Sequence, residues 1–223
     1  LQERSGTTYN SYLNKLRRLF KLSGYGHLLS GLETVREHRT PARYFQQHHI
    51  DLLHKHISKH QPELWLFIKF IYYCFIRPGE LRHLKAGDIM IYEGKILIRG
   101  IHAKNHKNQY VAIPKPFLAD LEFIKRTPPR AYIFPGKDPL NPIGLNTMSS
   151  RHRKILRELG FTSEYQMYSW KHTGAVQLAR AGVGLKAIQL QLRHHSLDQT
   201  DEYLRQLGVD DFDELKENFP PID

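Results

Sequence analysis

Apolar residues recur at helical spacing along most of the chain, and this pattern predicts a mainly helical fold. The segment Glu63–Ile76 is apolar on nearly every side, which is typical of a helix buried in a core. We expect helices at Thr7–Lys21, His49–Lys59, Glu63–Ile76, Pro116–Arg126, Thr147–Leu159, Ser169–Ala181, Leu185–Leu192 and Ser196–Leu207.

Local signals mark two helix ends. Arg77 precedes Pro78, a context that disfavours helical backbone, so we expect the apolar helix to end there. Ser196 and Gln199 form a capping-box pattern at the start of the last helix, and Gly208 can end that helix.

One stretch has short β-rich runs instead of helical spacing. These runs are Ile89–Tyr92, Lys95–Arg99 and Tyr110–Ile113, separated by Glu93-Gly94 and by a basic loop from His102 to Gln109. The stretch predicts a small three-stranded antiparallel sheet, so the fold class is mainly α with one such sheet.

Charge narrows the class of partner. The 223 residues carry 33 Lys and Arg against 22 Asp and Glu, a net charge of +11. Residues 209–223 hold six acids and one base, so the rest of the chain carries +16. A field of that size suits a polyanion, with nucleic acid as the leading candidate, although a generic basic surface would have the same charge.

Several kinds of site are excluded or disfavoured. A single cysteine, Cys74, rules out an internal disulfide and a cysteine-based zinc cluster. The histidines at 48, 49, 54, 56 and 60 fit no zinc-ligand spacing, so we expect no metal and a solvated or DNA-facing helix there. There is no phosphate-binding glycine loop, no HExxH and no nucleophile elbow. The longest apolar run is too short to span a bilayer, so we expect no membrane insertion.

The chain divides into three parts. Residues 1–40 hold one amphipathic helix that cannot bury its own apolar face, followed by a polar linker. We interpret them as the remnant of an upstream domain. Residues 41–208 form the main domain, and residues 209–223 form an acidic tail.

Candidate chemistry lies at ordered positions in the main domain. Arg77 follows the apolar helix and Glu80 can orient its guanidinium, although a structural ion pair is the commoner role for such an Arg. Lys104 lies in the basic loop between two strands. The segment Tyr168-Ser-Trp-Lys171-His-Thr-Gly and then Leu-Arg193-His194 follow, and Tyr203 comes nine residues after His194.

This set resembles the catalytic domain of the tyrosine recombinase, or phage integrase, family. In that family Arg-x-x-Glu follows a buried helix, as Arg77-Pro-Gly-Glu80 does here, and a Lys on a β-hairpin follows, as Lys104 does 27 residues on. His-x-x-Arg-His-Thr, Leu-Gly-His and the nucleophilic Tyr complete the pattern. The 32 residues from Lys171 to Tyr203 match the family's spacing.

Three positions depart from the family's pattern. Tyr168 stands where the family has His, Lys171 where it has the second Arg, and Arg193 where it has Gly. Lys keeps the charge but loses the fork that grips two phosphate oxygens. Arg193, Arg151 or Arg153 is then the candidate for the second guanidinium.

The resemblance implies site-specific DNA cleavage and rejoining through a 3′-phosphotyrosyl intermediate, without metal or other cofactor, for integration or excision of a mobile element. Tyr203 would attack, Arg77, Lys171 and His194 would surround the non-bridging oxygens, and Lys104 would protonate the leaving oxygen. Glu80, Tyr168 and Arg193 would support them. The alternative is a DNA-binding module of the same fold with reduced or lost catalysis; an RNA-binding protein would explain the charge but not the spacings.

The resemblance also implies the partners and the location of the protein. Double-stranded DNA is the expected substrate, contacted by Arg151, Arg153, Lys154 and Arg157 of the predicted Thr147–Leu159 helix, which also carries His152, and by Lys107. The family's assembly implies a tetrameric synapse in which protomers exchange C-terminal tails, here with Phe212, Leu215 and Phe219 as an apolar stripe. A cytoplasmic, nucleoid-associated protein is expected.

Overall fold

The computed structural model describes residues 6–36, 42–103 and 106–209. The chain splits into two compact units, Leu1–Pro41 and Ala42–Asp223. The first unit contains α1 (Gly6–Leu22) and a 3-10 turn, η1 (Gly26–Leu29). No helix among the described residues has both the length and the apolar character needed to cross a membrane.

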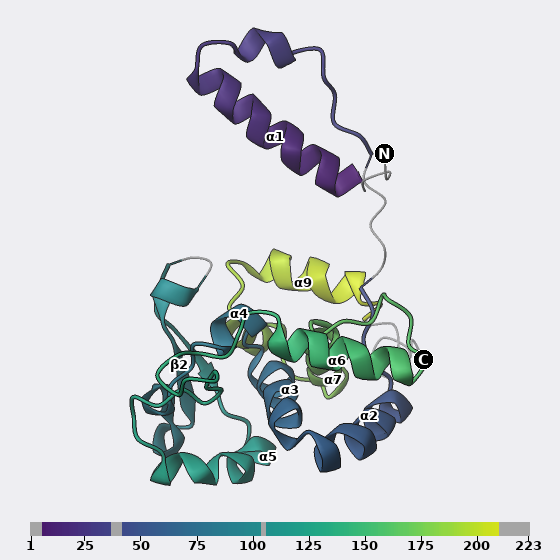
Figure 1. The fold of residues 1–223 in the computed structure, drawn as a ribbon. Coiled ribbons are helices and arrows are strands. Elements are labelled where there is room, and N and C mark those ends of the chain that lie inside the picture. The colour runs from purple at the N-terminus through teal and green to yellow at the C-terminus, as the bar shows by residue number, and fades with distance from the viewer. Residues whose placement is uncertain (1–5, 37–41, 104–105, 210–223) are drawn as a thin grey trace, which may run out of the picture. The chain divides into compact units, whose positions relative to one another are not determined.

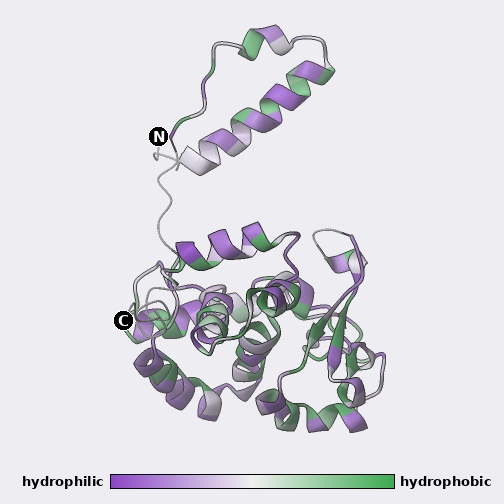
Figure 2. Cartoon of the chain, turned by 180° about the vertical axis from the view of Figure 1, so that it is seen from behind, coloured by the Kyte–Doolittle hydropathy of each residue, from purple (hydrophilic) through white to green (hydrophobic). Residues whose placement is uncertain are grey.

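In the first unit an irregular segment follows η1 and contacts α1. The side-chain amide of Asn10 exchanges two hydrogen bonds of 2.9 Å with the backbone of Val35, and Arg17 donates to the carbonyl of Leu32. Polar and apolar residues alternate in bands along α1 (Figure 2). Leu16, Leu19 and other apolar side chains of this unit are exposed. The expected amphipathic helix is therefore present.

The second unit is mainly helical with a small sheet (Figure 1). Its α-helices are α2 (Gln47–His60), α3 (Pro62–Cys74), α4 (Pro78–Leu81), α5 (Lys115–Leu118), α6 (Thr147–Glu158), α7 (Ser169–Arg180), α8 (Leu185–Leu192) and α9 (Leu197–Gln206). Its 3-10 helices are η2 (Ala86–Asp88), η3 (Ile91–Glu93), η4 (Gly100–His102) and η5 (Ala119–Arg126).

The three strands form an antiparallel sheet in the order β1-β2-β3, as the sequence predicts, but the first strand ends at Met90, since Ile91 and Tyr92 belong to the 3-10 helix η3. The strands are β1 (Ile89–Met90), β2 (Lys95–Ile98) and β3 (Gln109–Ala112). Buried Ile96 lies opposite buried Val111, which places one face of the hairpin on the core. At the edge of β3, the side-chain amide of Gln191 in α8 accepts from the backbone N–H of Ala112 and donates to its carbonyl. The sheet is thus tied to the helix that leads into His194.

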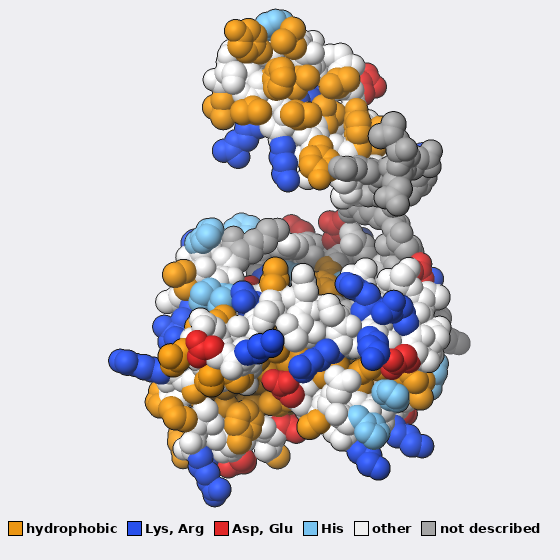
Figure 3. All heavy atoms as spheres, viewed as in Figure 1, with side chains coloured by type: hydrophobic (Ala, Val, Ile, Leu, Met, Phe, Trp, Pro, Cys, Tyr) orange, Lys and Arg blue, Asp and Glu red, His pale blue; other side chains and the backbone are white. Residues whose placement is uncertain are grey.

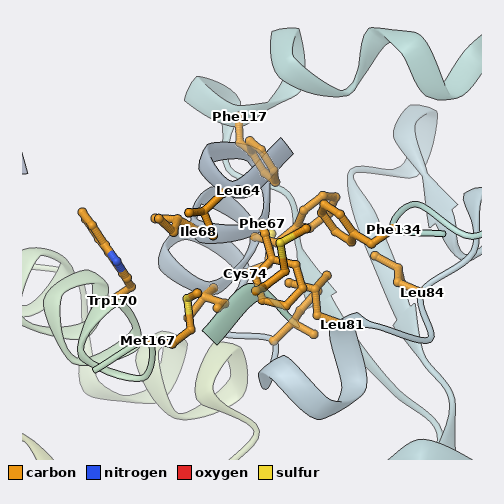
Figure 4. Close-up of a cluster of buried hydrophobic side chains, with 14 of the residues drawn as sticks. Leu64, Phe67, Ile68, Cys74, Leu81, Leu84, Phe117, Phe134, Met167 and Trp170 are labelled. Atoms are coloured by element: carbon orange, nitrogen blue, oxygen red, sulfur yellow. The ribbon is translucent and has the colours of Figure 1, made fainter. Parts of the chain in front are cut away.

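Helix α3 is the centre of the core. It packs against α2, α6 and α7, which is why it is apolar all round. Figure 4 shows Phe67 and Cys74 of α3 beside Phe134, with Met167 and Trp170 in the same cluster. The Phe67 and Phe134 rings meet edge to face at 4.9 Å.

Two helix boundaries differ from prediction. Helix α3 ends at Cys74 because Phe75 adopts left-handed backbone with φ 53°, so the chain leaves the helix before Arg77-Pro78. The predicted helix Pro116–Arg126 is one α-turn, α5, followed by the 3-10 helix η5. The short helix α4 after Pro78 was not predicted, since four residues carry no periodic signal. The other helices lie where the apolar pattern places them.

The contact between α3 and α7 depends on a glycine. A Cβ at Gly174 would collide with the carbonyl oxygen of Tyr72 and lie 2.7 Å from Cε1 of Phe75. The absence of a side chain lets the two backbones approach, and this brings the start of α7 next to the end of α3.

We predict that Gly174→Ala lowers the free energy of unfolding by about 2–3 kcal/mol, because backbone must move to admit the methyl group. Urea unfolding followed by circular dichroism measures this. Gly79→Ala is the matched control, since a Cβ there meets no atom within 4 Å. Equal stability of the two variants would contradict the close-packing argument.

Candidate active site

Arg77 and Glu80 form one unit at the start of α4. Pro78 begins this helix, and the backbone N–H of Arg77 donates to Oε2 of Glu80 at 3.1 Å. The Arg77 guanidinium binds the other oxygen, Nη1 to Oε1, at 3.0 Å. Glu80 therefore orients Arg77, as expected, while about a third of the Arg77 side chain stays exposed (32%).

Glu80 also holds Arg193. Nη2 of Arg193 lies 2.5 Å from Oε2 of Glu80, and both side chains are buried. Arg193 ends α8 in left-handed backbone, φ 58°, a conformation that glycine adopts more easily. Its Nε and Nη1 have no hydrogen-bond partner among the described residues. Burial disfavours the carboxylate, but Arg193 and then Arg77 outweigh it and hold the pKa of Glu80 below its ordinary value.

Lys171 lies at the start of α7 and is almost wholly buried. Its ammonium donates to the carbonyl of Phe75 at 3.2 Å and lies 5.8 Å from the centre of the Tyr168 ring. Burial, followed by the charges of Arg77 and Arg193, lowers the pKa of Lys171 to about 7. Lys171 is therefore a cation whose charge is only half present at neutral pH in the absence of a bound anion.

Tyr203 lies on α9 and faces α7. Its hydroxyl is 2.8 Å from Nδ1 of His172, and the two rings are tilted by 37°. The ring of His194 stands perpendicular to that of Tyr203 at 5.4 Å. Burial, and then Tyr168, raise the pKa of Tyr203 above its ordinary value. Ionisation of this phenol therefore needs a proton acceptor and nearby positive charge.

His172 is a residue that the sequence analysis did not select. Burial, and then the charge of Lys171, lower its pKa to about 4, so its ring is neutral at pH 7. Its only sequence signal was its place after Lys171 in the His-Thr part of the motif. The pairing with Tyr203 depends on how α7 and α9 pack.

His194 is held between α8 and α9. Its Nδ1 lies 3.0 Å from Oγ1 of buried Thr200. Ser196 caps α9 by accepting from the backbone N–H of Gln199 at 3.2 Å, as the capping pattern predicts. Burial, then Lys171 and Arg77, lower the pKa of His194 to about 4.

Tyr168 lies at the N-terminus of α7, within the same cluster. Its ring meets the ring of His172 edge to face at 5.0 Å, and it lies close enough to Arg77 for that positive charge to act on its hydroxyl. Burial raises the pKa of Tyr168, although 36% of the residue is exposed. It is thus a hydrogen-bonding group at the edge of the site.

The structure brings together most of the predicted residues. The members of this cluster are Arg77, Glu80, Tyr168, Lys171, Arg193, His194 and Tyr203. Lys104 lies outside the described residues, as does the apolar stripe of the tail. Among the side chains that the structure describes, no three His, Cys, Asp or Glu groups are placed to hold a metal ion.

The basic side chains of α6 are not members of this cluster. Figure 3 shows Lys and Arg side chains gathered on the face that carries this helix. Arg151 pairs with Glu63 at 3.1 Å, and Lys154 is strongly exposed. Arg153 and Arg157 line a pocket of about 340 Å³ that reaches Tyr168. Lys107 is exposed on the β2–β3 loop.

One residue of α6 is not where the sequence analysis placed it. His152 was expected on the DNA-facing side, but it is 1% exposed and accepts a hydrogen bond from Nε1 of Trp170 at 3.0 Å. Position 152 lies on the stripe of α6 that packs on the core with Ile155 and Leu156. Burial lowers the pKa of His152 to about 4, so it is a neutral core residue.

Comparison with known proteins identifies the family of this chain. Residues 43–208 match the model of the phage integrase family. Tyrosine recombinase XerA of Pyrococcus furiosus is 25% identical over 200 residues, which cover 88% of this chain and 68% of that protein. The putative integrase/recombinase y4qK of Sinorhizobium fredii is 30% identical over 135 residues, 60% of this chain and 43% of that protein. The chain thus spans only part of these relatives.

Solved structures share the fold. An integrase of the transposon Tn1549, in complex with a circular intermediate DNA, superposes with a TM-score of 0.74 at 13% identity, over 91% of this chain and 76% of that one. The crystal structure of XerA recombinase gives 0.63 at 18% identity, over 98% and 85%. The predicted fold class is confirmed.

We predict that Lys171→Met removes a pH dependence of stability. The pKa is about 7 in the folded chain against an ordinary 10.5, so the unfolded chain binds more protons between these values. The contribution of Lys171 to the free energy of unfolding therefore rises as the pH increases from about 7 to 10.5 and falls as the pH returns toward 7. The change is at most about 1.4 kcal/mol per pH unit.

Urea unfolding at pH 7 and pH 9.5 measures the effect. The gain in unfolding free energy with pH should be smaller in Lys171→Met than in the unsubstituted chain, and unchanged in the exposed control Lys154→Met. The same gain in all three proteins would show that Lys171 titrates normally.

Proposed function

The chain belongs to the phage integrase family, and from this membership we propose that it is a site-specific recombinase that cleaves and rejoins DNA through Tyr203. The observation that supports this most directly is the position of the Tyr203 hydroxyl, which is partly buried and lies against His172 in the cluster that holds Arg77, Lys171 and His194. A role in integration or excision of a mobile element is part of the proposal. It is supported by relatives named as integrases.

The proposed reaction is a reversible exchange at phosphorus. Oη of Tyr203 attacks the scissile phosphate, the bond to the 5′-oxygen breaks, and a 3′-phosphotyrosyl bond and a 5′-hydroxyl result. The 5′-hydroxyl of another strand then attacks the phosphotyrosyl bond and releases Tyr203. Because the covalent bond conserves the energy of the broken one, the exchange needs no nucleotide cofactor.

The cations of the site would stabilise the charge that develops on the non-bridging oxygens. Arg77 presents the exposed part of its guanidinium while Glu80 fixes the other side. Lys171 would gain its full charge as the phosphate binds, since a neighbouring anion raises the pKa of an amine. His194 would donate a hydrogen bond from the nitrogen that does not face Thr200. Lys104 is proposed as the acid for the leaving 5′-oxygen.

Arg193 is the strongest candidate for the missing second guanidinium. It shares the Glu80 carboxylate with Arg77 and lowers the pKa of Lys171, so it lies within electrostatic reach of the site. Arg151 instead pairs with Glu63 at the start of α3. Arg193 is buried, so its contribution would be to place Arg77 and to add positive potential.

DNA binding is proposed for the α6 face and the β2–β3 loop. Arg153, Arg157 and Lys154 are exposed there, and phosphate contacts of this kind make binding salt-dependent. XerH is a related fold solved with its palindromic difH DNA. A tetrameric synapse with tail exchange remains part of the proposal.

A DNA-binding module with lost catalysis is the second candidate. The observation that favours it is Lys171, because a lysine with a pKa of about 7 lacks both the constant charge and the fork of an arginine. The two candidates differ in whether a covalent adduct forms.

We predict that a DNA duplex nicked beside the scissile phosphate traps a covalent adduct, visible as a shifted band on a denaturing gel. Tyr203→Phe should abolish the adduct and retain DNA binding. The matched control Tyr92→Phe, at a fully surface-exposed tyrosine (91%), should retain both. DNA binding without any adduct from the unsubstituted chain would favour the binding module.

We further predict that Arg193→Met slows adduct formation by at least about tenfold, since Glu80, which orients Arg77, loses one of its two guanidinium partners and the site loses a charge. Arg151→Met should change the rate by less than about twofold, because Arg151 is exposed and pairs with Glu63 rather than with a residue of the cluster. The rates come from single-turnover assays on the nicked substrate. A larger effect of Arg151→Met would assign the second guanidinium to α6.

A further inference from the structure

We propose that His172 is the catalytic base that takes the proton from the Tyr203 hydroxyl as the phenol attacks phosphorus. This inference rests on the proposed function and adds a residue role to it. The placement is direct: Nδ1 of His172 and Oη of Tyr203 are 2.8 Å apart, within the range required of a base and its proton donor.

The packing of α7 and α9 holds this pair in place. His172 follows Lys171 in α7, while Tyr203 comes from α9, and the two helices are in contact. The ring of Tyr168 also packs edge to face with the imidazole, with ring centres 5.0 Å apart. The base and the nucleophile are therefore positioned by secondary structure before DNA binds.

His172 is in the protonation state that a base requires. Its pKa of about 4 leaves the ring neutral at pH 7, because burial and Lys171 disfavour the imidazolium. The groups that face the ring are Lys171 and Tyr168 on its own element and Tyr203 on α9. With a proton on Nε2, Nδ1 accepts from the phenol. The charge of a bound phosphate would favour the imidazolium that forms.

The neighbouring groups are less suited to this role. Tyr168 is itself a phenol with a raised pKa, so it keeps its own proton at neutral pH and cannot accept the proton of Tyr203. His194 directs its Nδ1 to Thr200 and presents its ring edge-on to Tyr203. Lys171 donates to the carbonyl of Phe75. Of these side chains, His172 is the one whose nitrogen lies on the Tyr203 hydroxyl.

The proton balance is simple. The hydroxyl proton of Tyr203 moves to Nδ1 of His172, Oη bonds to phosphorus, and the bond from phosphorus to the 5′-oxygen breaks. That oxygen takes its proton from a separate acid, for which Lys104 is the candidate. In rejoining, the incoming 5′-hydroxyl gives its proton to the deprotonated form of that acid and its oxygen bonds to phosphorus. The bond from phosphorus to Oη of Tyr203 breaks, and the imidazolium returns its proton to Tyr203.

A substrate with sulfur in place of the bridging 5′-oxygen tests this assignment. A thiolate leaves without being protonated. A variant that lacks the acid should therefore react at a normal rate on the sulfur substrate, whereas a variant that lacks the base should stay slow. We expect His172→Ala and His172→Gln to slow adduct formation by about 10²–10³-fold on both substrates. His60→Gln, at an exposed histidine at the end of α2, is the matched control and should react normally.

A pH series supplies the second readout. Without the base, the variant depends on phenolate formed by solvent. The phenolate fraction rises about tenfold per pH unit, whereas the neutral His172 of the unsubstituted chain acts equally well across this range. The ratio of the unsubstituted rate to the variant rate should therefore fall by about tenfold per pH unit between pH 6 and 8. Comparing the two proteins cancels the titration of Lys171, which both contain. A constant ratio would indicate a structural role and overturn the proposal.

The remaining outcomes are also decisive. Recovery of His172→Ala on the sulfur substrate would make His172 an acid, and a normal rate in His172→Gln would show that proton transfer to the ring is not needed. Either result overturns the base and leaves Tyr203 as nucleophile. No adduct from the unsubstituted chain on either substrate would instead remove the proposed function, and this inference with it. Unfolding curves establish that the variants fold.

Discussion

The buried carboxylate of Glu80 makes the rest of the site possible, because it binds two guanidiniums that would otherwise repel each other. Arg77 takes one of its oxygens and Arg193 the other, and Lys171 lies close enough for both to lower its pKa. A buried charge without a partner costs several kcal/mol, so this cation cluster needs the anion at its centre. Glu80 also ties α4 to the end of α8. The geometry of the site and its electrostatic balance thus depend on one side chain.

Packing in the core determines the position of this cluster of charged residues. Gly174 lets α7 approach α3, and Phe75 leaves α3 in left-handed backbone, with its carbonyl directed at the Lys171 ammonium. The side chain of Gln191 then joins the edge of the sheet to α8. Through these contacts the segment that follows α3 and the helices α7, α8 and α9 bring their functional residues into one region, while the sheet is joined to α8.

Apolar periodicity was enough to predict most helices and the three-stranded sheet, because core-facing positions repeat in the sequence. The order and spacing of Arg77, Lys171, His194 and Tyr203 were enough to predict which residues would meet. The early end of α3 was missed because a left-handed Phe75 has no local sequence signal. Likewise, the burial of His152 and the pairing of His172 with Tyr203 depend on how helices pack, which residue type alone does not reveal.

The central claim is that Tyr203 is the residue that becomes joined to DNA, with Tyr168 as the other phenol of the site. The most direct test is to trap the adduct on nicked DNA, digest protein and DNA, and locate the attached nucleotide by mass spectrometry. The account predicts the nucleotide on the peptide His194–Arg205, at Tyr203. Attachment at Tyr168 or at any other residue would contradict it.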